Sequence, residues 1–139
     1  QRMRRTQRPF AVALLDLDHF KAINDRLGHL VGDEVLRRFT LRAAAEMRTT
    51  DRLGRYGGEE FLMVLTVTDD PAAAVTAVER VREGVQRHPW HEVAAGMKVT
   101  VSAGVAVARA GETLEQLLQR ADEALYCAKR EGRNCSRLG

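Results

Sequence analysis

The chain has 139 residues, 45% of them hydrophobic, and a formal net charge of +3 at pH 7. That length accommodates one domain with its own core, and no apolar run reaches the length that would cross a membrane. The mild charge does not predict a nucleic-acid partner, and two cysteines near the C-terminus indicate free thiols in a cytoplasmic protein rather than a disulfide framework.

The first residues are rich in arginine, with Arg2, Arg4, Arg5 and Arg8. We interpret residues 1–9 as the remnant of an upstream linker that leads into a domain spanning residues 10–139. A solvated segment is the simpler interpretation of these arginines, and a phosphate-binding arm is the alternative.

Residues 10–17 are nearly all apolar, which predicts a strand buried on both faces. Apolar residues at helical spacing then predict a short helix over residues 20–27, which Gly28 can close. A longer helix is expected over residues 31–47, and its inward-facing residues are Val35, Leu36, Phe39, Ala43 and Met47.

A hairpin is predicted next, from residues 52–56 and 60–67. Its turn contains the pair Gly57-Gly58. Glycine adopts positive φ angles readily, so the pair is expected to form a tight turn with φ > 0. The same two glycines lack Cβ atoms, so they leave room for a ligand to approach the backbone. Gly54 lies within the first strand of this hairpin and is expected to loosen it.

A third helix follows, with Asp70 as its N-cap and Pro71 at its first position. Its predicted buried face comprises Ala74, Val78, Val81 and Val85. Residues 88–96 are expected to form a loop. Alternating apolar residues then predict a strand over residues 99–107.

The last helix is predicted to begin at a capping box formed by Thr113 and Gln116 and to end at Gly132. Its apolar stripe comprises Leu114, Leu117, Ala121, Leu125 and Ala128. The order β-α-α-β-β-α-β-α, with room for one minor extra hairpin, predicts an α/β sandwich. Its central mixed sheet would carry helices on both faces.

Two acidic segments lie at the ends of predicted buried strands. Asp16 and Asp18 end the first strand, and Glu59 and Glu60 follow the glycine pair. An unpaired carboxylate at a buried strand end is costly, and a cation would relieve that cost. Carboxylates on neighbouring strand ends can hold hard cations such as Mg²⁺, as a phosphoryl or nucleotidyl transferase requires.

Five blocks of the sequence occur in a distinctive order, namely residues 16–25, 28–33, 55–61, 100–105 and 121–134. In this order they resemble the GGDEF domain of the diguanylate cyclase family, in its GGEEF variant. The resemblance implies a palm-like sheet akin to that of nucleotide polymerases and adenylyl cyclases. It also implies a bacterial signalling enzyme that condenses two GTP molecules, one on each chain of a homodimer, into cyclic di-GMP and two pyrophosphates.

For the metal site the resemblance implies Asp16, the backbone carbonyl of Leu17, Glu59 and Glu60, which would hold Mg²⁺ or Mn²⁺. Glu59 is also the implied base for the attacking 3′-hydroxyl group. The alternative is that these acids cap helix or turn amides. We expect Asp18 to be the N-cap of the short helix that follows it.

For GTP the resemblance implies Lys21, Asn24, Asp33, Gly57, Gly58, Lys129 and Arg133. Asn24 and Asp33 would bind guanine, because a carboxylate accepts from N1–H and N2–H₂, a pattern of donors that adenine lacks. Lys129 and Arg133 would grip the β- and γ-phosphates, although four-residue spacing alone also fits a solvated helix face. Lys21 has either a phosphate-proximal or a carboxylate-pairing role, and Arg55 would stabilise charge in the transition state.

A second site is indicated by the R-x-x-D motif from Arg48 to Asp51, shortly before the signature turn. The resemblance implies an allosteric inhibitory site for dimeric cyclic di-GMP. Arginine would contact guanine O6 and N7 there, and aspartate would accept from N1–H and N2–H₂. Chance occurrence of this short motif is the alternative, and Arg80 or Arg82 is a candidate to join the site.

The implied partners are GTP, cyclic di-GMP, a second copy of the chain and an upstream sensory or regulatory domain. The family's usual D-x-L-T-x-L-x-N-R segment is missing before the first strand, which leaves autonomous activity open. One alternative function is a weakly active domain that acts as a cyclic di-GMP receptor through Arg48 and Asp51. Another is a cyclase for a different purine nucleotide, against which Asn24 and Asp33 argue.

Overall fold

The computed structural model describes residues 9–66 and 69–139 of the chain. The helices are α1 (Phe20–Leu27), α2 (His29–Glu46), α3 (Pro71–Arg87), the short 3₁₀ helix η1 (Trp90–Glu92) and α4 (Leu114–Arg130). The strands are β1 (Phe10–Leu17), β2 (Arg52–Arg55), β3 (Glu60–Thr66), β4 (Val101–Val107) and β5 (Ser136–Leu138). Val67 and the four N-terminal arginines lie outside the described residues.

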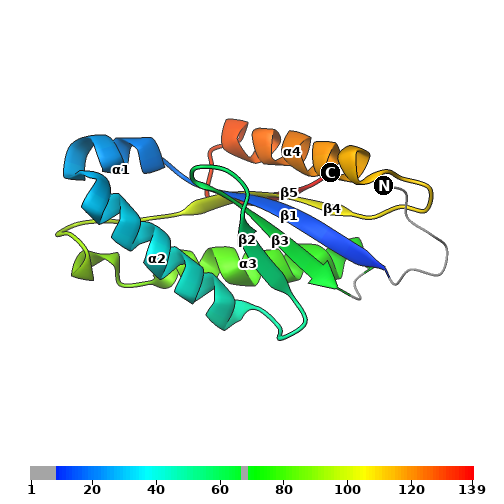
Figure 1. Ribbon diagram of the computed structural model, residues 1–139, viewed down its shortest axis with the longest axis horizontal. Coiled ribbons are helices and arrows are strands. Elements are labelled where there is room, and N and C mark those ends of the chain that lie inside the picture. Colours follow the sequence, from blue (N-terminus) through cyan, green and yellow to red (C-terminus); the bar gives the residue numbers. More distant parts are fainter. Residues whose placement is uncertain (1–8, 67–68) are drawn as a thin grey trace.

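A single mixed sheet has the strand order β2-β3-β1-β4-β5 (Figure 1). β1 is central and runs antiparallel to both β3 and β4, whereas β5 lies parallel to β4 at one edge. The predicted bounds of β1 are confirmed, and seven of its eight residues are buried, as expected for an apolar strand covered on both faces. Both ends of β1 are therefore flanked by neighbouring strands.

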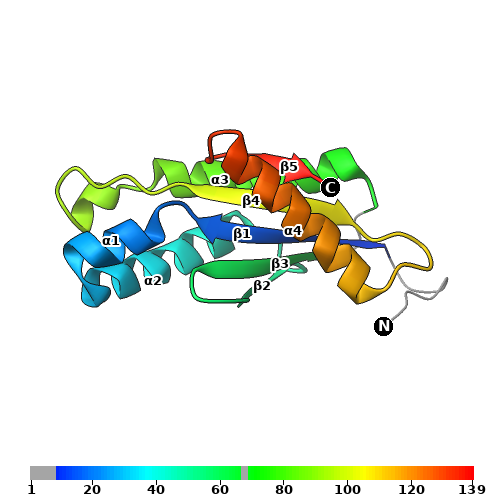
Figure 2. The ribbon, with the colours of Figure 1, turned by 90° about the horizontal axis from the view of Figure 1, so that it is seen from above.

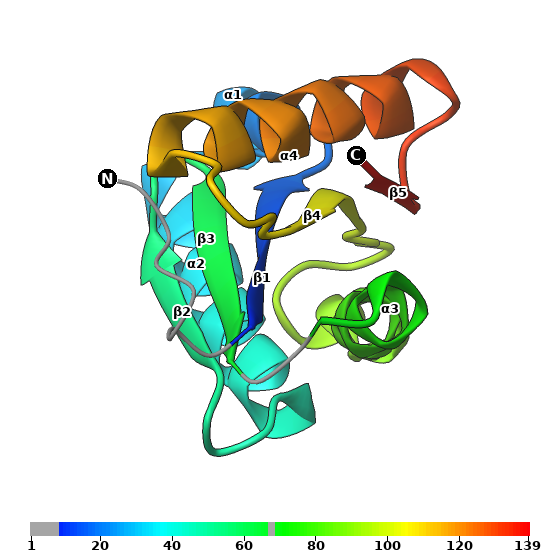
Figure 3. The ribbon, with the colours of Figure 1, turned by 90° about the vertical axis from the view of Figure 1, so that its right-hand side faces the viewer.

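Helices cover both faces of this sheet (Figures 2 and 3). Odd-numbered residues of β1, such as Ala13 and Leu15, belong to a core shared with α2 and α3. Even-numbered residues, such as Val12 and Leu14, pack instead with α4. The predicted α/β sandwich is thus confirmed. Because side chains alternate along a strand, Asp16 extends the even-numbered row toward α4.

Glycine at position 104 allows α4 to lie directly on β4. A Cβ atom at Gly104 would stand 2.0 Å from the Ala121 carbonyl oxygen and 2.3 Å from the Leu125 amide nitrogen. Both atoms belong to the backbone of α4, so no side-chain rotation could relieve the clash. This close contact fixes the height of α4 above the sheet and with it the position of residues near the end of the helix.

The predicted starts of α3 and α4 are confirmed, together with their capping residues. The Asp70 carboxylate accepts a hydrogen bond from the Ala72 amide at 3.0 Å, and Pro71 is the first residue of α3. Thr113 and Gln116 form the reciprocal capping box of α4. α2 begins at His29, two residues earlier than predicted, and ends at Glu46. Across the described ranges, no helix is both long enough and apolar enough to span a membrane.

Other features also differ from the sequence expectation. β4 begins at Val101, two residues later than predicted. The predicted loop over residues 88–96 contains η1, where Trp90 is buried and its indole nitrogen donates to the Val85 carbonyl at 2.7 Å. In place of an extra hairpin, β5 adds a parallel edge strand. Leu114, expected on the apolar stripe of α4, is 47% exposed, because the first turn of the helix projects past the core.

Candidate active site

The end of β1 gathers acidic and basic groups. Asp16 is only 6% exposed and lies opposite Glu60 on β3 and Ser102 on β4. Its Oδ2 atom forms an ion pair with the Lys129 ammonium, which reaches it from α4. Its Oδ1 atom is buried and finds no hydrogen-bond partner among the described residues. A buried carboxylate oxygen without a partner is costly, so the described residues satisfy Asp16 incompletely.

The signature turn is joined to this strand end. The Leu17 amide donates to the Glu59 carbonyl at 3.4 Å, which brings the second acidic segment beside the first. Burial, followed by the charge of the neighbouring Asp16, raises the pKa of Glu60, while the Lys129 ammonium opposes that rise. The negative charge of Asp16 thus disfavours ionisation of Glu60, and a cation bound between the two carboxylates would relieve this repulsion.

The described side chains do not complete a metal site by themselves. Within residues 9–66 and 69–139, no three His, Cys, Asp or Glu side chains gather closely enough to hold an ion. The donor types at this strand end nevertheless suit Mg²⁺, because the unpartnered Asp16 oxygen and the Glu60 carboxylate are hard oxygen ligands. The residues therefore fit a hard divalent cation whose remaining ligands come from water or substrate.

The glycine pair differs from its predicted conformation. Gly57 and Gly58 are absent from the residues with positive φ in the described chain, so the expectation of a turn with φ > 0 is wrong. The turn is closed instead by the Tyr56 and Gly57 amides, which both donate to the Glu60 carbonyl. A Cβ atom at position 58 would meet nothing within 4 Å. Neither a positive φ angle nor internal packing requires glycine at position 58.

Arg55 fastens the same turn. Its guanidinium donates to the carbonyl oxygens of Gly57 and Gly58 and lies 5.4 Å from the centroid of the Phe61 ring. Arg55 is thus held by the backbone of the turn that follows it, at an exposed position beside the glycines.

The two predicted guanine ligands lie at the junction of α1 and α2. The Asn24 side chain rests against Gly32, where a Cβ atom would stand 1.8 Å from Asn24 Oδ1. That oxygen is buried and has no hydrogen-bond partner in the described part of the chain. Asp33, the residue after Gly32, is exposed. The unpartnered Asn24 oxygen therefore lies against Gly32, and the next residue in the chain carries the exposed Asp33 carboxylate.

The remaining predicted phosphate ligands are dispersed. Lys21 is exposed and forms an ion pair with Asp25 one helical turn away, at 3.2 Å. Arg133 lies beyond α4, in a turn where its φ is 64°. Its position relative to Lys129 is consequently set by that turn rather than by helical spacing.

Asp18 has a different role from the one predicted. The residue at the N-cap of α1 is His19, in the left-handed region, and its side chain makes no capping hydrogen bond. Asp18 is buried and accepts hydrogen bonds from Thr100 Oγ1 and Ser102 Oγ, each at 2.7 Å, and from the Asn134 amide at 3.0 Å. The N-cap prediction is wrong, because donors distant in sequence claim the carboxylate.

The R-x-x-D motif forms a compact local site. The Asp51 side chain is 1% exposed and accepts from the Arg48 amide at 3.2 Å and from the Arg48 guanidinium at 3.1 Å. The same guanidinium donates to the Thr66 carbonyl at 3.1 Å. Arg82, one of two candidates to join this site, is bonded to Glu79 and Asn134 and is largely buried, whereas Arg80 is exposed.

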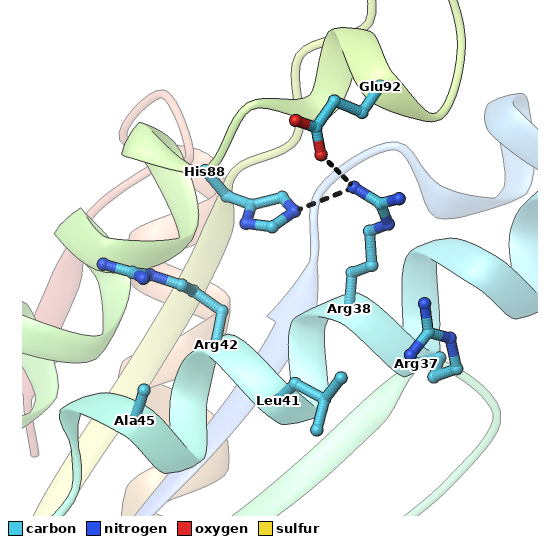
Figure 4. A pocket seen from close by; sticks show the side chains of 7 residues that line it. All are labelled: Arg37, Arg38, Leu41, Arg42, Ala45, His88 and Glu92. Atoms are coloured by element: carbon cyan, nitrogen blue, oxygen red, sulfur yellow. Dashed lines mark hydrogen bonds and ion pairs between the residues drawn. The ribbon is translucent and has the colours of Figure 1, made fainter.

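A hollow of about 340 Å³ between α2 and the end of α3 is rich in arginine (Figure 4). Its lining residues are Arg37, Arg38, Leu41, Arg42, Ala45, His88 and Glu92. Arg38 donates to Glu34 and Glu92, and Arg42 donates to Glu46. Burial, then the charges of Arg38 and Arg42, lowers the pKa of His88. These paired charges form a seam between helices, on the face of the sheet opposite to the Asp16 side chain.

Comparison with known proteins identifies the domain. The sequence model of the family described as "Diguanylate cyclase, GGDEF domain" matches residues 1–135, and the chain belongs to this family. It is 48% identical over 130 residues to the response regulator PleD of Caulobacter vibrioides (strain NA1000 / CB15N), an alignment that covers 91% of this chain and 28% of PleD. The chain therefore spans little more than a quarter of that relative.

Solved structures give the same result. The active GGEEF domain of a diguanylate cyclase from Vibrio cholerae superposes with a TM-score of 0.86 at 35% identity, covering 94% of this chain and 83% of that one. The coiled coil and GGDEF domain of DgcB from Caulobacter crescentus, in complex with c-di-GMP, superposes with a TM-score of 0.84 at 32% identity, covering 95% of this chain and 70% of that one. The predicted palm-like fold and family membership are thus confirmed.

Proposed function

We propose that this domain is a Mg²⁺-dependent nucleotidyltransferase that condenses two GTP molecules into cyclic di-GMP and two pyrophosphates. One observation carries the proposal. An incompletely satisfied buried carboxylate, Asp16, lies opposite Glu60 and is paired with Lys129, beside a turn in which Gly58 leaves open space. Family membership supports the choice of reaction.

The metal-binding residues would be Asp16, the Leu17 carbonyl, Glu59 and Glu60. Mg²⁺, or Mn²⁺ in its place, supplies Lewis-acid stabilisation of the attacking and leaving oxygens when bound. The raised pKa of Glu60 supports this assignment, because like-charged carboxylates at one strand end favour a cation between them. Glu59 would accept the proton of the attacking 3′-hydroxyl group.

The guanine base would be held by Asn24 and Asp33. Asn24 Oδ1 is buried without a partner in the described residues, and such an acceptor suits the N–H donors of guanine. Asp33 would accept from the remaining donors on the same edge. Adenine presents neither pattern of donors, so a site built this way should reject ATP by a factor of about 10⁴.

The triphosphate would be bound by Lys129 and Arg133, with Lys21 nearby. Lys129 pairs with Asp16 in the ligand-free chain. We infer that it exchanges this partner for phosphate oxygens when nucleotide and metal enter, which leaves both Asp16 oxygens available to the cation. Gly57 and Gly58 would let the phosphates approach the turn, and Arg55 would leave its turn carbonyls to stabilise developing charge.

Each domain would supply one bound GTP, so the reaction would need a homodimer in which two sites face each other. Within each pair, the 3′-hydroxyl of one GTP attacks the α-phosphate of the other and pyrophosphate leaves. We further propose that an upstream sensory or regulatory domain governs this pairing in a longer cytoplasmic or membrane-anchored protein. The much greater length of PleD supports that view.

Arg48 and Asp51 would form an inhibitory site for cyclic di-GMP. The two side chains already lie together, and both offer groups complementary to guanine. DgcB, whose structure holds c-di-GMP, supports binding of this ligand to the family. Arg80, which is exposed, is a better candidate to join the site than Arg82, whose guanidinium is engaged elsewhere.

The alternative function is a weakly active receptor that binds cyclic di-GMP through the same pair. The preformed contact between Arg48 and Asp51 favours binding under either function, so turnover decides between them.

The test is incubation of the chain with GTP and Mg²⁺, with products identified by mass spectrometry. We expect cyclic di-GMP and pyrophosphate, and a loss of at least about a hundredfold in rate for Glu59→Ala, since general bases contribute on that scale. Arg48→Ala is the matched control, expected to abolish product binding while sparing or raising turnover. Binding of cyclic di-GMP without turnover by the wild-type chain would establish the receptor instead.

A further inference from the structure

The turn that follows α4 has an unusual backbone. Gly132 ends the helix with φ of 118°, and the Arg133 amide donates back to the Ala128 carbonyl at 3.0 Å. Arg133 and Asn134 then both adopt positive φ, at 64° and 48°. Two successive non-glycine residues in the left-handed region are rare, because the Cβ atom crowds the following carbonyl. Contacts from elsewhere must therefore hold this turn.

Asp18 provides those contacts from the end of β1. Its Oδ2 atom accepts from the Asn134 amide at 3.0 Å and from Thr100 Oγ1 at 2.7 Å. Its Oδ1 atom accepts from Ser102 Oγ at 2.7 Å, and the same hydroxyl lies 3.1 Å from the Asn134 amide. The residue is 5% exposed, so these charge-assisted hydrogen bonds form in a nearly dry environment.

Two further contacts fasten the residues that follow Arg133. The Arg82 guanidinium on α3 donates to Asn134 Oδ1 at 2.8 Å. The Cys135 carbonyl accepts from the Ala103 amide of β4 at 3.0 Å. Arg133 itself is exposed. An exposed side chain thus projects from a backbone that is fixed on both sides.

We propose that Asp18 is a positioning residue of the nucleotide site, which fixes the turn so that Arg133 is aimed at the phosphates. This inference rests on the proposed function of Arg133. Asp18 and Asp16 belong to one strand end, so the metal-binding carboxylate and the anchor of the phosphate-binding turn share a rigid support. With three donors on its two oxygens, Asp18 is built as an anchor rather than as a metal ligand.

The physical gain is preorganisation. A long arginine side chain on a loose turn would lose both backbone and side-chain freedom when it bound phosphate. Because Asp18 orders the backbone of the turn when the chain folds, that part of the entropy is not lost again when nucleotide binds. Weakening the anchor should therefore weaken nucleotide binding through Arg133 and leave the chemical step nearly unchanged.

The experiment is a double-mutant cycle of Asp18→Asn and Arg133→Ala. It measures KM and kcat for GTP and, independently of turnover, the affinity for a non-hydrolysable GTP analogue. We expect Asp18→Asn to weaken binding about tenfold, as for a misaligned charge-assisted contact, with kcat within about twofold. In the Arg133→Ala background the same substitution should change binding less than about twofold, since its effect runs through Arg133.

Asp70→Ala is the control for stability alone. It removes the N-cap of α3 and should lower Tm without changing the affinity for the analogue. Thr100→Val, which deletes one of the three donors to Asp18, is the milder substitution if Asp18→Asn fails to fold. It should shift binding in the same direction by a smaller factor.

Several outcomes would overturn the proposal. Equal effects of Asp18→Asn with and without Arg133 would show that the anchor does not act through that arginine. A changed Mg²⁺ concentration for half-maximal activity would make Asp18 a metal ligand. If the analogue binds and the effect of Asp18→Asn depends on Arg133, but no cyclic di-GMP forms, only the proposed reaction is contradicted. If cyclic di-GMP forms but the effect of Asp18→Asn does not depend on Arg133, only the role of Asp18 is contradicted. A wild-type chain that bound no analogue would refute both.

Discussion

Asp16 and Asp51 are each 6% exposed as whole residues, and each is paired with a basic side chain, yet the two sites are built differently. Asp51 is satisfied locally, by the amide and guanidinium of Arg48 three residues earlier. Asp16 depends on Lys129, which comes from a helix at the other end of the chain, and still has one oxygen without a partner in the described residues. A complete local pair stabilises the turn that contains it, whereas the incomplete long-range pair leaves an oxygen that, under the proposed function, would bind the metal ion.

Replacing each aspartate by its isosteric amide should separate the two sites most strongly. We expect Asp16→Asn to reduce GTP turnover by at least about a thousandfold, because it would remove a carboxylate that we propose binds the metal ion. Asp51→Asn is the matched control, because Asp51 is also a buried aspartate, and it should retain turnover while losing inhibition by cyclic di-GMP. Initial rates with and without added product measure both effects, and comparable losses of turnover in the two variants would contradict the distinction.

The long-range character of the Asp16 site predicts a second difference. Gly104→Ala would place a methyl group against the backbone of α4 and so displace the helix that carries Lys129. We expect it to lower the free energy of unfolding by about 2–4 kcal/mol and to impair turnover in whatever fraction still folds. Denaturant titration and turnover check this prediction.

Gly54→Ala is the control for that substitution. Its Cβ atom would meet nothing within 4 Å, and Gly54 is not among the residues with positive φ. The change should leave stability unaltered or raise it by about 0.5 kcal/mol, since alanine restricts the unfolded chain. A large loss of stability from Gly54→Ala would show that the hairpin, rather than α4, is the sensitive element.

The smallest expected effect concerns pH. The pKa of Glu60 is raised by burial and by Asp16, so the folded chain holds this proton more tightly than the unfolded chain does. Stability from this source is present below the unfolded value of 4.5 and is lost as pH rises through the higher folded pKa. The Tm of Glu60→Gln should therefore rise relative to that of the wild type as pH increases above the folded pKa of Glu60. Thermal melts over a range of pH, without metal, measure this difference in Tm.

Mg²⁺ provides the control for the pH prediction. Bound at this strand end, it should favour the charged form of Glu60 and reduce the advantage of Glu60→Gln near neutral pH. An advantage that was independent of both pH and Mg²⁺ would exclude this carboxylate as the cause.

Periodicity and local capping rules predicted most of the fold. β1 was predicted to the residue, and the buried faces of α2 and α3 followed from apolar spacing, because helices and strands expose their periodicity in the sequence. Asp70 and Thr113 were identified as caps, since their partners lie within three residues. Features that depend on partners close in sequence were thus accessible without a structure.

Features that depend on distant partners were not accessible in this way. Asp18 resembled a helix cap, but Thr100, Ser102 and Asn134 bind it from far along the chain. The strand β5 has only three residues, too few to show a pattern. Of the candidate site, Asp16 and Glu60 could be named from their strand-end positions, whereas the Asp16–Lys129 pair required the packing of α4 on β4.

The measurement that tests the central claim most directly is the initial rate of cyclic di-GMP formation per chain, taken over a wide range of protein concentration at fixed GTP and Mg²⁺. If the Asp16 site holds half of a reaction completed by a second domain, the rate per chain rises with concentration until the dimer is saturated. A rate per chain that is constant from the lowest concentration, down to conditions where the chain is shown to be monomeric, would contradict the account.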